Sequence, residues 1–285
     1  MGEVRLAFRN QSCQRVAIKC IKKAKLTIHG THEIDQTKSI ERETEILQRL
    51  EHPCILSIEN AVHTEDYAYL ILEYLEGGEL FDRIVNQPAK RLSEPLAKLY
   101  FYQMSHAVKY LHDQEVTHRD LKPENILLCS IQPETLVKIT DFGLSKIVDE
   151  SALKTYCGTK NYLAPEVLAA GAMGTGFYTK LVDVWSMGVI LFVCLGGYPP
   201  FSSDYNDMSL EDQIRTGRYT FADNRWNTVS ENAKDLIRQM LVVEPSKRIS
   251  LAAILDHEWL KDKEMTEKAR NLMYPQCDGM IPPVS

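Results

Sequence analysis

The first quarter of the chain alternates hydrophobic and polar residues in short runs, and the rest repeats hydrophobic residues at helical spacing. The runs Val4–Ala7 and Val16–Lys19 flank a polar turn at 9–14, a pattern that predicts a β-hairpin. Two more β-rich runs follow at 55–59 and 68–74. We therefore expect a small antiparallel sheet in this part of the chain.

The remainder is predicted to be mostly helical. Ser93 supplies a capping hydroxyl and Pro95 lies in the first turn, so a helix is expected to run from there to about His112. Ser209 opens a run that resembles a capping box, with Asp212 in place of the usual glutamate. Further helices are expected over 179–195, 209–216, 230–241 and 250–260.

A strand-rich part followed by a helix-rich part predicts an α+β protein with two lobes. The first lobe also contains one predicted helix over 36–50, because Ile40, Thr44, Leu47 and Leu50 fall on one helical face. The two glycines at 77 and 78 mark the join. The expected boundaries are an N-lobe at 1–74, a hinge at 75–78, a C-lobe at 79–265 and a loosely ordered tail at 266–285.

Composition adds modest limits. The 285 residues are 44% hydrophobic and 25% charged, as in ordinary globular proteins, and the net charge of −6 argues against nucleic acid as the main partner. The seven cysteines form no CxxC pair, so reduced thiols are expected rather than zinc ligands or a disulfide framework. The start has no apolar signal region, and the apolar run Val189–Leu195 is too short to span a membrane.

The run from His118 to Asn125, followed by Asp141, carries the chemistry. Phosphoryl transfer needs a positioned hydroxyl, metal on the phosphates and stabilised negative charge. Asp120 is expected to orient the attacking hydroxyl, and Lys122 to reach the γ-phosphate of ATP. Asn125 and Asp141 offer the oxygen ligands that Mg²⁺ prefers. The ordered set matches the protein kinase pattern, and the chain resembles that family, whose members use ATP and Mg²⁺.

The nucleotide site is expected to draw on both lobes. Lys19 matches the strand lysine that contacts the α- and β-phosphates, and its partner is a glutamate of the next helix. Glu41, Glu43 and Glu45 are the candidates, and Glu43 is favoured because it lies on the same helical side as Ile40. The full expected ATP-binding set is Gly2, Val4, Ala17, Lys19, Glu43, Leu72, Glu73, Leu75, Glu79, Glu124, Asn125, Leu127 and Asp141.

Within this set, the connector Leu72–Leu75 is expected to read the adenine edge through its backbone, with Leu72 guarding the back of the pocket. Val4, Ala17 and Leu127 would supply the apolar walls. Glu79 would bind a ribose hydroxyl or pair with a substrate arginine.

Other positions gain roles from the resemblance. It implies that Glu166 pairs with Arg248 for structural reasons, and that phosphorylated Thr155 orders its loop against Arg119. Thr159 is expected to contact Asp120 and Lys122, and is a second possible phosphosite. His118 is interpreted as a packed structural histidine and His52 as a lobe-positioning loop residue, and the other histidines are expected to be incidental.

The resemblance covers nearly the whole chain and narrows to the calcium/calmodulin-dependent kinase group, within it to the checkpoint kinase 2 family. The runs that carry it include Gly77–Asp82, Ser186–Leu191, Gly197–Phe201 and Leu99–Met104. It implies a serine/threonine kinase of the nuclear DNA-damage response, which Lys122 next to Pro-Glu supports. It also implies preference for arginine three residues before the acceptor, and homodimers through exchanged activation segments. A nuclear or cytoplasmic rather than a secreted protein is expected.

Two departures from the family pattern bear on these expectations. The glycine-rich loop is represented only by its last glycine, Gly2, so the N-lobe is expected to lack its first strand. Lys160 and Asn161 lie where relatives often have Pro-Thr or Pro-Glu. Two functions therefore stay open: an active protein kinase, and a kinase-shaped interaction module with weak catalysis because its nucleotide lid is incomplete.

Overall fold

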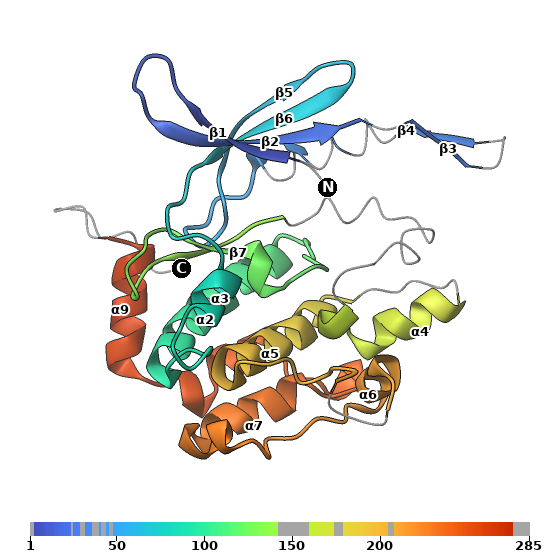
Figure 1. The fold of residues 1–285 in the computed structure, drawn as a ribbon, viewed down its shortest axis with the longest axis vertical. Helices are drawn as coiled ribbons and strands as arrows, with labels where there is room; N and C mark the ends of the chain where they lie inside the picture. The colour runs from blue at the N-terminus through green and yellow to red at the C-terminus, as the bar shows by residue number, and fades with distance from the viewer. Residues whose placement is uncertain are drawn as a thin grey trace.

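The computed structural model has two lobes of different composition, a β-sheet lobe and a helical lobe, joined by a short connector (Figure 1). The α+β prediction is therefore confirmed. The structure describes residues 3–23, 25–28, 32–35, 40, 44–45, 48–141, 160–173, 179–204 and 208–275.

The N-lobe is built on a four-stranded antiparallel sheet in the order β1-β2-β6-β5. The predicted hairpin is present as β1 (Glu3–Phe8) and β2 (Arg15–Lys22), and β6 (Tyr67–Glu73) confirms the run at 68–74. The other predicted run was placed too early, since β5 covers Ile58–His63. Ile55 instead forms an isolated parallel bridge with Ile139 of the other lobe. The backbone of Cys54 and Leu56 is hydrogen-bonded to Ile139, so this stretch pairs with the C-lobe and not with the N-lobe sheet.

A second hairpin, β3 (Lys25–Ile28) with β4 (His32–Asp35), was not predicted. The predicted helix over 36–50 lies largely outside the described residues. Within it, Ile40 and Thr44 are buried and Glu45 is exposed, and the Thr44 hydroxyl donates to the carbonyl of Ile40 at 2.7 Å. This spacing of four residues agrees with the predicted face.

The connector requires its glycines. A side chain at Gly77 would collide with the carbonyl of Ser130 and with Leu128, and Gly78 has a φ of +70°, which favours glycine. This close approach lets Gly77 N–H donate to Leu128 at 3.0 Å, while Leu128 N–H donates to Gly78 at 2.9 Å. The connector is thereby bonded to the first strand of the C-lobe.

The C-lobe is mainly helical and also carries the short antiparallel pair β7 (Ile126–Leu128) and β8 (Val137–Ile139). The four helices predicted to begin near 93, 179, 209 and 230 are all present, within two residues at each end. Its α-helices are α2 (Leu80–Val85), α3 (Glu94–Asp113), α4 (Pro165–Met173), α5 (Leu181–Gly196), α6 (Leu210–Thr216), α7 (Glu231–Met240), α8 (Leu251–Leu255) and α9 (Lys263–Met273). Its short 3₁₀ turns are η1 (Pro123–Asn125), η4 (Lys160–Tyr162), η5 (Asn224–Thr228), η6 (Pro245–Lys247) and η7 (Glu258–Leu260).

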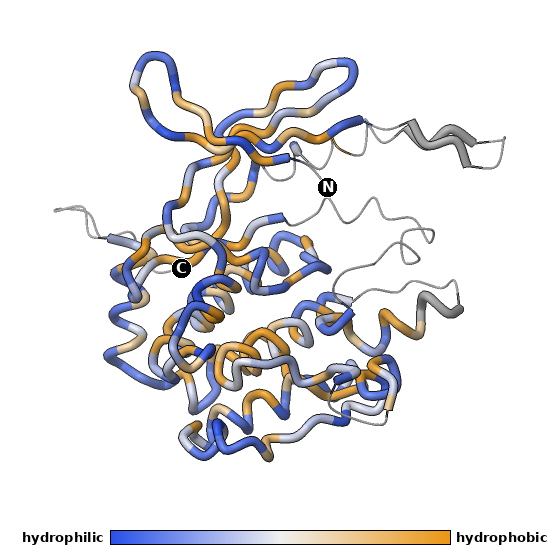
Figure 2. Tube along the Cα trace, viewed as in Figure 1, coloured by the Kyte–Doolittle hydropathy of each residue, from blue (hydrophilic) through white to orange (hydrophobic). Residues whose placement is uncertain are grey.

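Helix α5 is the centre of the C-lobe core. Its residues from Val182 to Gly196 are all buried, and the helix is largely orange in the hydropathy view (Figure 2). One charged residue, Asp183, lies in this apolar helix with 0% exposure. A fully buried carboxylate needs donors around it, so Asp183 marks a site where other segments converge.

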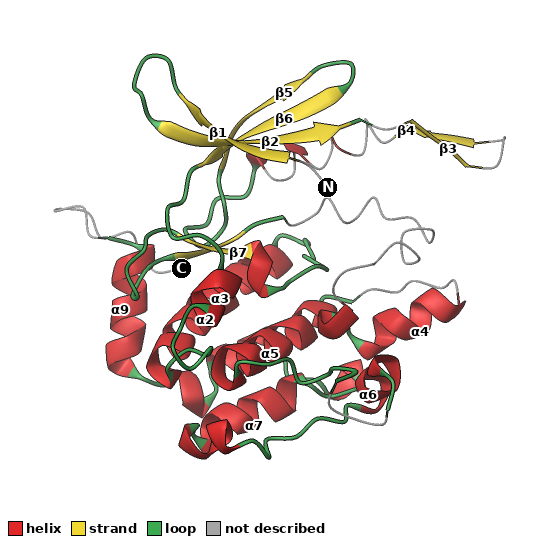
Figure 3. Cartoon of the chain, viewed as in Figure 1, coloured by secondary structure: helices red, strands yellow, loops and turns green. Residues whose placement is uncertain are grey.

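Two predictions near the C-terminus need correction (Figure 3). The helix expected over 250–260 is divided into α8 and η7, because Asp256 and His257 end the first helix and His257 caps the next turn. The tail was expected to be loosely ordered from residue 266, but α9 continues to Met273. Its apolar face packs on α3 through Met265, Ala269 and Met273, all buried.

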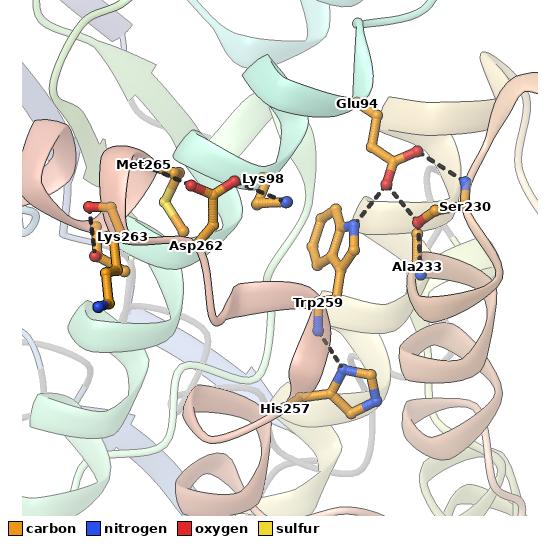
Figure 4. A network of polar contacts seen from close by, with 10 residues as sticks. Glu94, Lys98, Ser230, Ala233, His257, Trp259, Asp262, Lys263 and Met265 are labelled. Atoms are coloured by element: carbon orange, nitrogen blue, oxygen red, sulfur yellow. Dashed lines mark hydrogen bonds and ion pairs between the residues drawn. The ribbon is translucent and has the colours of Figure 1, made fainter.

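Polar contacts fasten this end of the lobe to α3 (Figure 4). Glu94 accepts hydrogen bonds from the backbone and hydroxyl of Ser230 and from the indole N–H of Trp259 at 2.8 Å. One turn along, Lys98 donates to Asp262 at 3.1 Å. Burial acts to raise the pKa of Glu94, but the hydrogen bonds outweigh it and lower the pKa below 4.5. Across the described residues, no helix has both the length and the apolar character to cross a membrane.

Candidate active site

The predicted catalytic residues lie in the loop between α3 and β7. Lys122 precedes the 3₁₀ turn η1, which ends at Asn125, and strand β7 follows at once. Pairing of β7 with β8 brings the end of this loop beside the residues before Asp141, and Thr140 N–H donates to the carbonyl of Asn125 at 2.9 Å. Short strands therefore bring two motifs that are far apart in the sequence to one place.

Asp120, Lys122 and Asn125 form one hydrogen-bonded group. Lys122 Nζ lies 2.8 Å from Asp120 Oδ2, and Asn125 Nδ2 donates to the same oxygen at 3.1 Å and to the Asp120 carbonyl at 2.7 Å. Asn125 is buried, whereas the side chains of Asp120 and Lys122 are 23% and 17% exposed. The loop thus fixes the Asp120 carboxylate while leaving it partly accessible.

Asp183 holds the start of this loop, a role that the sequence did not reveal. Its carboxylate accepts from the backbone N–H of His118 at 2.9 Å and of Arg119 at 2.8 Å. It also lies 2.8 Å from His112 Nε2, so His112 is not incidental. Arg119 adopts a φ of +69°, which is uncommon for a residue with a side chain and persists where surroundings impose it. The one feature of the sequence that could have revealed this role is the position of Asp183 as a single acidic residue in an otherwise apolar helix.

His118 is a packed histidine, as predicted. It is 0% exposed, its Nε2 donates to the Thr140 carbonyl at 2.9 Å, and burial lowers its pKa. His52, predicted to position the lobes, packs its ring 5.2 Å from Tyr110 of α3 and accepts from Cys54 N–H at 3.1 Å.

Lys19 and Asp141 connect the two lobes. Lys19 Nζ contacts Asp141 Oδ1, and the lysine side chain is only 13% exposed. Asp141 has a φ of +58°, the left-handed region that aspartate enters more readily than most residues. Glu43, the favoured partner of Lys19, lies outside the described residues. So do Gly2, Phe142, Gly143, Thr155 and Thr159.

The predicted apolar walls mostly come together. Leu72, with Leu56 and Leu70, forms a small buried cluster against which Ala17, Leu75 and Leu127 pack. This cluster joins the N-lobe sheet to strand β7 of the C-lobe. Val4 is opposite Lys19 in the register of β1 and β2, and therefore shares its sheet face, but Val4 is 60% exposed and outside the cluster.

Glu79 and Glu124 lie in an acidic environment near the loop. Burial and the neighbouring carboxylates of Asp82, Glu124 and Asp141 raise the pKa of Glu79. Glu124 Oε2 is buried and accepts no hydrogen bond within the described part of the chain. Tyr162 lies within electrostatic range of Glu124, and burial raises the pKa of its phenol. An unpaired buried carboxylate oxygen is costly unless a donor reaches it.

The Glu166–Arg248 pair is present and bidentate. Arg248 donates to the two carboxylate oxygens at 2.8 and 2.9 Å and also to the carbonyls of Leu181 and Val242. Its side chain is 0% exposed, and its guanidinium lies 5.2 Å from the ring of Trp185. The pair fastens the start of α4 to the C-lobe core.

The residues fit a site in which a metal is shared with phosphates. No group of three or more His, Cys, Asp or Glu side chains able to hold a metal occurs in the described ranges. Mg²⁺ typically binds through one or two carboxylates, substrate phosphates and water rather than in a protein cage. Asn125 uses its amide nitrogen for Asp120, which reserves its oxygen as a ligand.

Comparisons with known proteins agree with this geometry. The protein kinase domain family matches residues 1–260. The chain is 46% identical over 281 residues to the ovarian-specific serine/threonine-protein kinase Lok of Drosophila melanogaster, covering 98% of this chain and 58% of that protein. It is 37% identical over 262 residues to the serine/threonine-protein kinase chk-2 of Caenorhabditis elegans, covering 91% and 54%.

A third relative is the calcium/calmodulin-dependent protein kinase type 1 of Macrobrachium nipponense, which is 43% identical over 260 residues, covering 91% of this chain and 71% of that protein. The chain spans about half the length of the Lok and chk-2 kinases. Protein kinase domains in general use ATP and a divalent metal and act on proteins. On its sequence match and on the arrangement of its catalytic loop, the chain belongs to the protein kinase domain family.

Proposed function

We propose that the protein is a serine/threonine protein kinase that transfers the γ-phosphate of ATP to proteins. The observation that carries the proposal is the group formed by Asp120, Lys122 and Asn125, with Lys19 and Asp141 paired across the lobes. These are the parts that phosphoryl transfer requires. A structural loop would have no need to keep two polar side chains, Lys122 and Asn125, on one partly accessible carboxylate.

Each residue has a distinct part in the proposed reaction. Asp120 accepts a hydrogen bond from the attacking hydroxyl and orients it toward the phosphorus. Lys122, already 2.8 Å from Asp120, places a positive charge where negative charge develops on the transferred group. Lys19 is available to the α- and β-phosphates once ATP competes with Asp141 for its ammonium.

The proposed cofactor is Mg²⁺, which neutralises phosphate charge when bound. Asn125 Oδ1 and the Asp141 carboxylate would hold it. The adenine ring is proposed to lie against Ala17, Leu72 and Leu127, which already pack in one cluster. The backbone of Glu73 and Leu75 would read its edge.

The proposed substrates carry arginine on the N-terminal side of the acceptor. Glu79 and Glu124 support this preference, because Glu124 Oε2 is buried without a hydrogen-bond donor in the described chain. A guanidinium is suited to such a carboxylate, since it supplies several N–H donors in a fixed plane. Two peptides that differ only in this arginine test the preference directly.

Regulation and cellular role are proposed from the relatives. A role in DNA-damage checkpoint signalling is proposed from the similarity to the Lok and chk-2 kinases. A nuclear location is proposed only from the resemblance to the checkpoint kinase 2 family. Phosphorylation of Thr155, and of Thr159 as a second site, would activate the protein, with Arg119 binding the phosphate and with dimers forming through the activation segment.

The decisive experiment is Asp120→Asn in an assay with Mg-ATP and an arginine-containing peptide. The wild type is expected to phosphorylate serine or threonine, and the variant to lose roughly 10²–10⁴-fold in turnover, the usual scale for a positioned acid–base group. Asparagine keeps the size of the side chain, so thermal stability and nucleotide affinity should change little. Equal turnover of the two proteins would remove Asp120 from this role.

A further inference from the structure

The carboxylate of Glu73 forms hydrogen bonds outside the predicted adenine site. Glu73 was predicted to contribute backbone atoms to the adenine edge, but its carboxylate is engaged elsewhere. Oε1 accepts from Lys138 Nζ at 2.8 Å and from the backbone N–H of Ser57 at 2.8 Å. The Glu73 side chain is 25% exposed and that of Lys138 is 12% exposed. The carboxylate therefore has two specific donors in a partly desolvated place.

These donors come from segments that belong to different parts of the fold. Glu73 is the last residue of β6, which leads into the connector. Lys138 is the middle residue of β8 in the C-lobe and lies three positions before Asp141. Ser57 belongs to the stretch before β5. One carboxylate thus joins the end of the N-lobe sheet to the strand that leads to Asp141.

The stretch before β5 is itself bonded to β8, which closes the arrangement. Ile139 N–H donates to the carbonyl of Cys54 at 2.9 Å, and Leu56 N–H donates to the carbonyl of Ile139 at 2.9 Å. Glu73 N–H in turn donates to the carbonyl of Ser57 at 3.3 Å. Glu73, at the end of β6, thus contacts both Ser57 of this stretch and Lys138 of β8.

The local electrostatics make Glu73 the partner of Lys138. Burial raises the pKa of the neighbouring thiols of Cys54 and Cys129 to about 12 and about 11. Burial also lowers the pKa of His52 to about 4. These three neighbours are therefore uncharged at pH 7, and the Glu73 carboxylate supplies the negative charge at hydrogen-bond distance from the Lys138 ammonium.

We propose that Glu73 and Lys138 form a positioning pair that keeps the adenine-reading connector in register with Asp141. The inference rests on the proposed kinase function and adds to it. In the proposed function the connector would bind the base of ATP, and Asp141 would help to hold the metal that neutralises phosphate charge. An error in the relative position of these two segments weakens nucleotide binding. The transfer step depends on it less, because Asp120 is held through Asp183, on α5.

The test uses Glu73→Gln, Lys138→Met and the double variant. Glutamine keeps an acceptor for Ser57 N–H and removes only the charge. Each single variant is expected to raise the ATP KM and the calorimetric Kd for Mg-ATP about five- to thirtyfold, the effect of one or two kcal/mol. The kcat at saturating ATP should stay within about twofold. The double variant should be no worse than the worse single variant, since both remove the same interaction.

Lys98→Met is the matched control. Lys98 lies 3.1 Å from Asp262, is 18% exposed and joins α3 to the residue before α9, away from the connector (Figure 4). It should leave the ATP KM unchanged. An unchanged KM in Glu73→Gln would overturn the proposal, and so would a fall in kcat at constant KM or fully additive effects. If Lys138→Met fails to fold, the near-isosteric Glu73→Gln still decides.

The calorimetric arm separates this proposal from the proposed function. Asp120→Asn should bind Mg-ATP with the wild-type Kd while transferring poorly. Were the wild-type protein to bind Mg-ATP without transferring phosphate, the kinase function would fail. A weaker Kd in Glu73→Gln would still support the positioning pair, and an equal Kd would count against it.

Discussion

The two lobes differ in how they hold the polar side chains of the candidate active site in position. The C-lobe has a large core around α5, where Asp183 is 0% exposed and the catalytic loop is bonded to it. The N-lobe sheet has a small cluster of Leu56, Leu70 and Leu72. Its strand β1 leaves Leu6 and Phe8 53% and 61% exposed.

This difference indicates how the side chains of Asp120 and Lys19 are held in position. Small units bury a smaller fraction of their surface and are correspondingly marginal. The C-lobe can fix Asp120 internally. The N-lobe places Lys19 by means of contacts that reach the other lobe, namely Lys19 with Asp141 and Glu73 with Lys138. Substitutions should therefore affect the two lobes differently, and three predictions examine this.

The largest effect is expected from Arg248→Met in the C-lobe. This change leaves Glu166 without its bidentate partner and removes the guanidinium donor from the carbonyls of Leu181 and Val242. Removing one partner of a buried pair costs about 3–5 kcal/mol. Chemical denaturation followed by tryptophan fluorescence should show a lower midpoint for the whole C-lobe.

The neighbouring Lys247→Met serves as a control. Lys247 pairs with Glu244, but its side chain is 72% exposed, and such changes usually lie within about 0.5 kcal/mol. Equal destabilisation by the two variants would mean that the Arg248 pair has no special weight in the C-lobe.

A smaller and more local effect is expected from Leu70→Ala in the N-lobe. Leu70 is 2% exposed, and a buried leucine truncated to alanine costs about 2–5 kcal/mol, here toward the lower end because the cluster is small. Hydrogen exchange should become faster in β2, β5 and β6 while α3 and α5 keep their protection.

Val62→Ala, on a residue of the same sheet that is 48% exposed, should leave exchange unchanged. Faster exchange in α5 in the Leu70→Ala protein would show that the two lobes open as one unit, and that the N-lobe is not separately less stable.

The smallest effect concerns the pH dependence contributed by Glu94. Its folded-state pKa is below the ordinary 4.5, so its stabilising effect is present above that value and is lost as the pH falls through the lowered pKa. Glu94→Gln removes this titration. The variant should be less stable than the wild type at pH 7, and the difference should shrink as the pH is lowered from 5 toward the lowered pKa.

Denaturation midpoints at several pH values measure this difference, with Glu65→Gln at an exposed site as the control. A constant difference between Glu94→Gln and the wild type over this range would contradict a charge-dependent role of Glu94.

Prediction from the sequence succeeded where the determining forces are local. Alternation in Val16–Lys19 specified a strand, and the Ser93 and Pro95 pattern marked the start of α3 to within one residue. The strand predicted at 55–59 was placed too early, because pairing of Ile55 with Ile139 across the lobes overrides the local β preference. The sequence analysis also missed α9, because this helix is specified by packing on α3 rather than by propensity.

The proposed catalytic residues Asp120, Lys122, Asn125 and Asp141 could be predicted from the sequence alone, because phosphoryl transfer requires fixed residue types at short spacing. Their supports could not. His112 and Asp183 are 71 residues apart, and Glu73 and Lys138 are 65 apart, so only the folded chain brings them together. A short motif therefore indicates the chemistry, whereas tertiary contacts decide which residues hold that motif in place. The physical reason is that a buried carboxylate needs hydrogen-bond donors, and these can come from any segment that packs beside it.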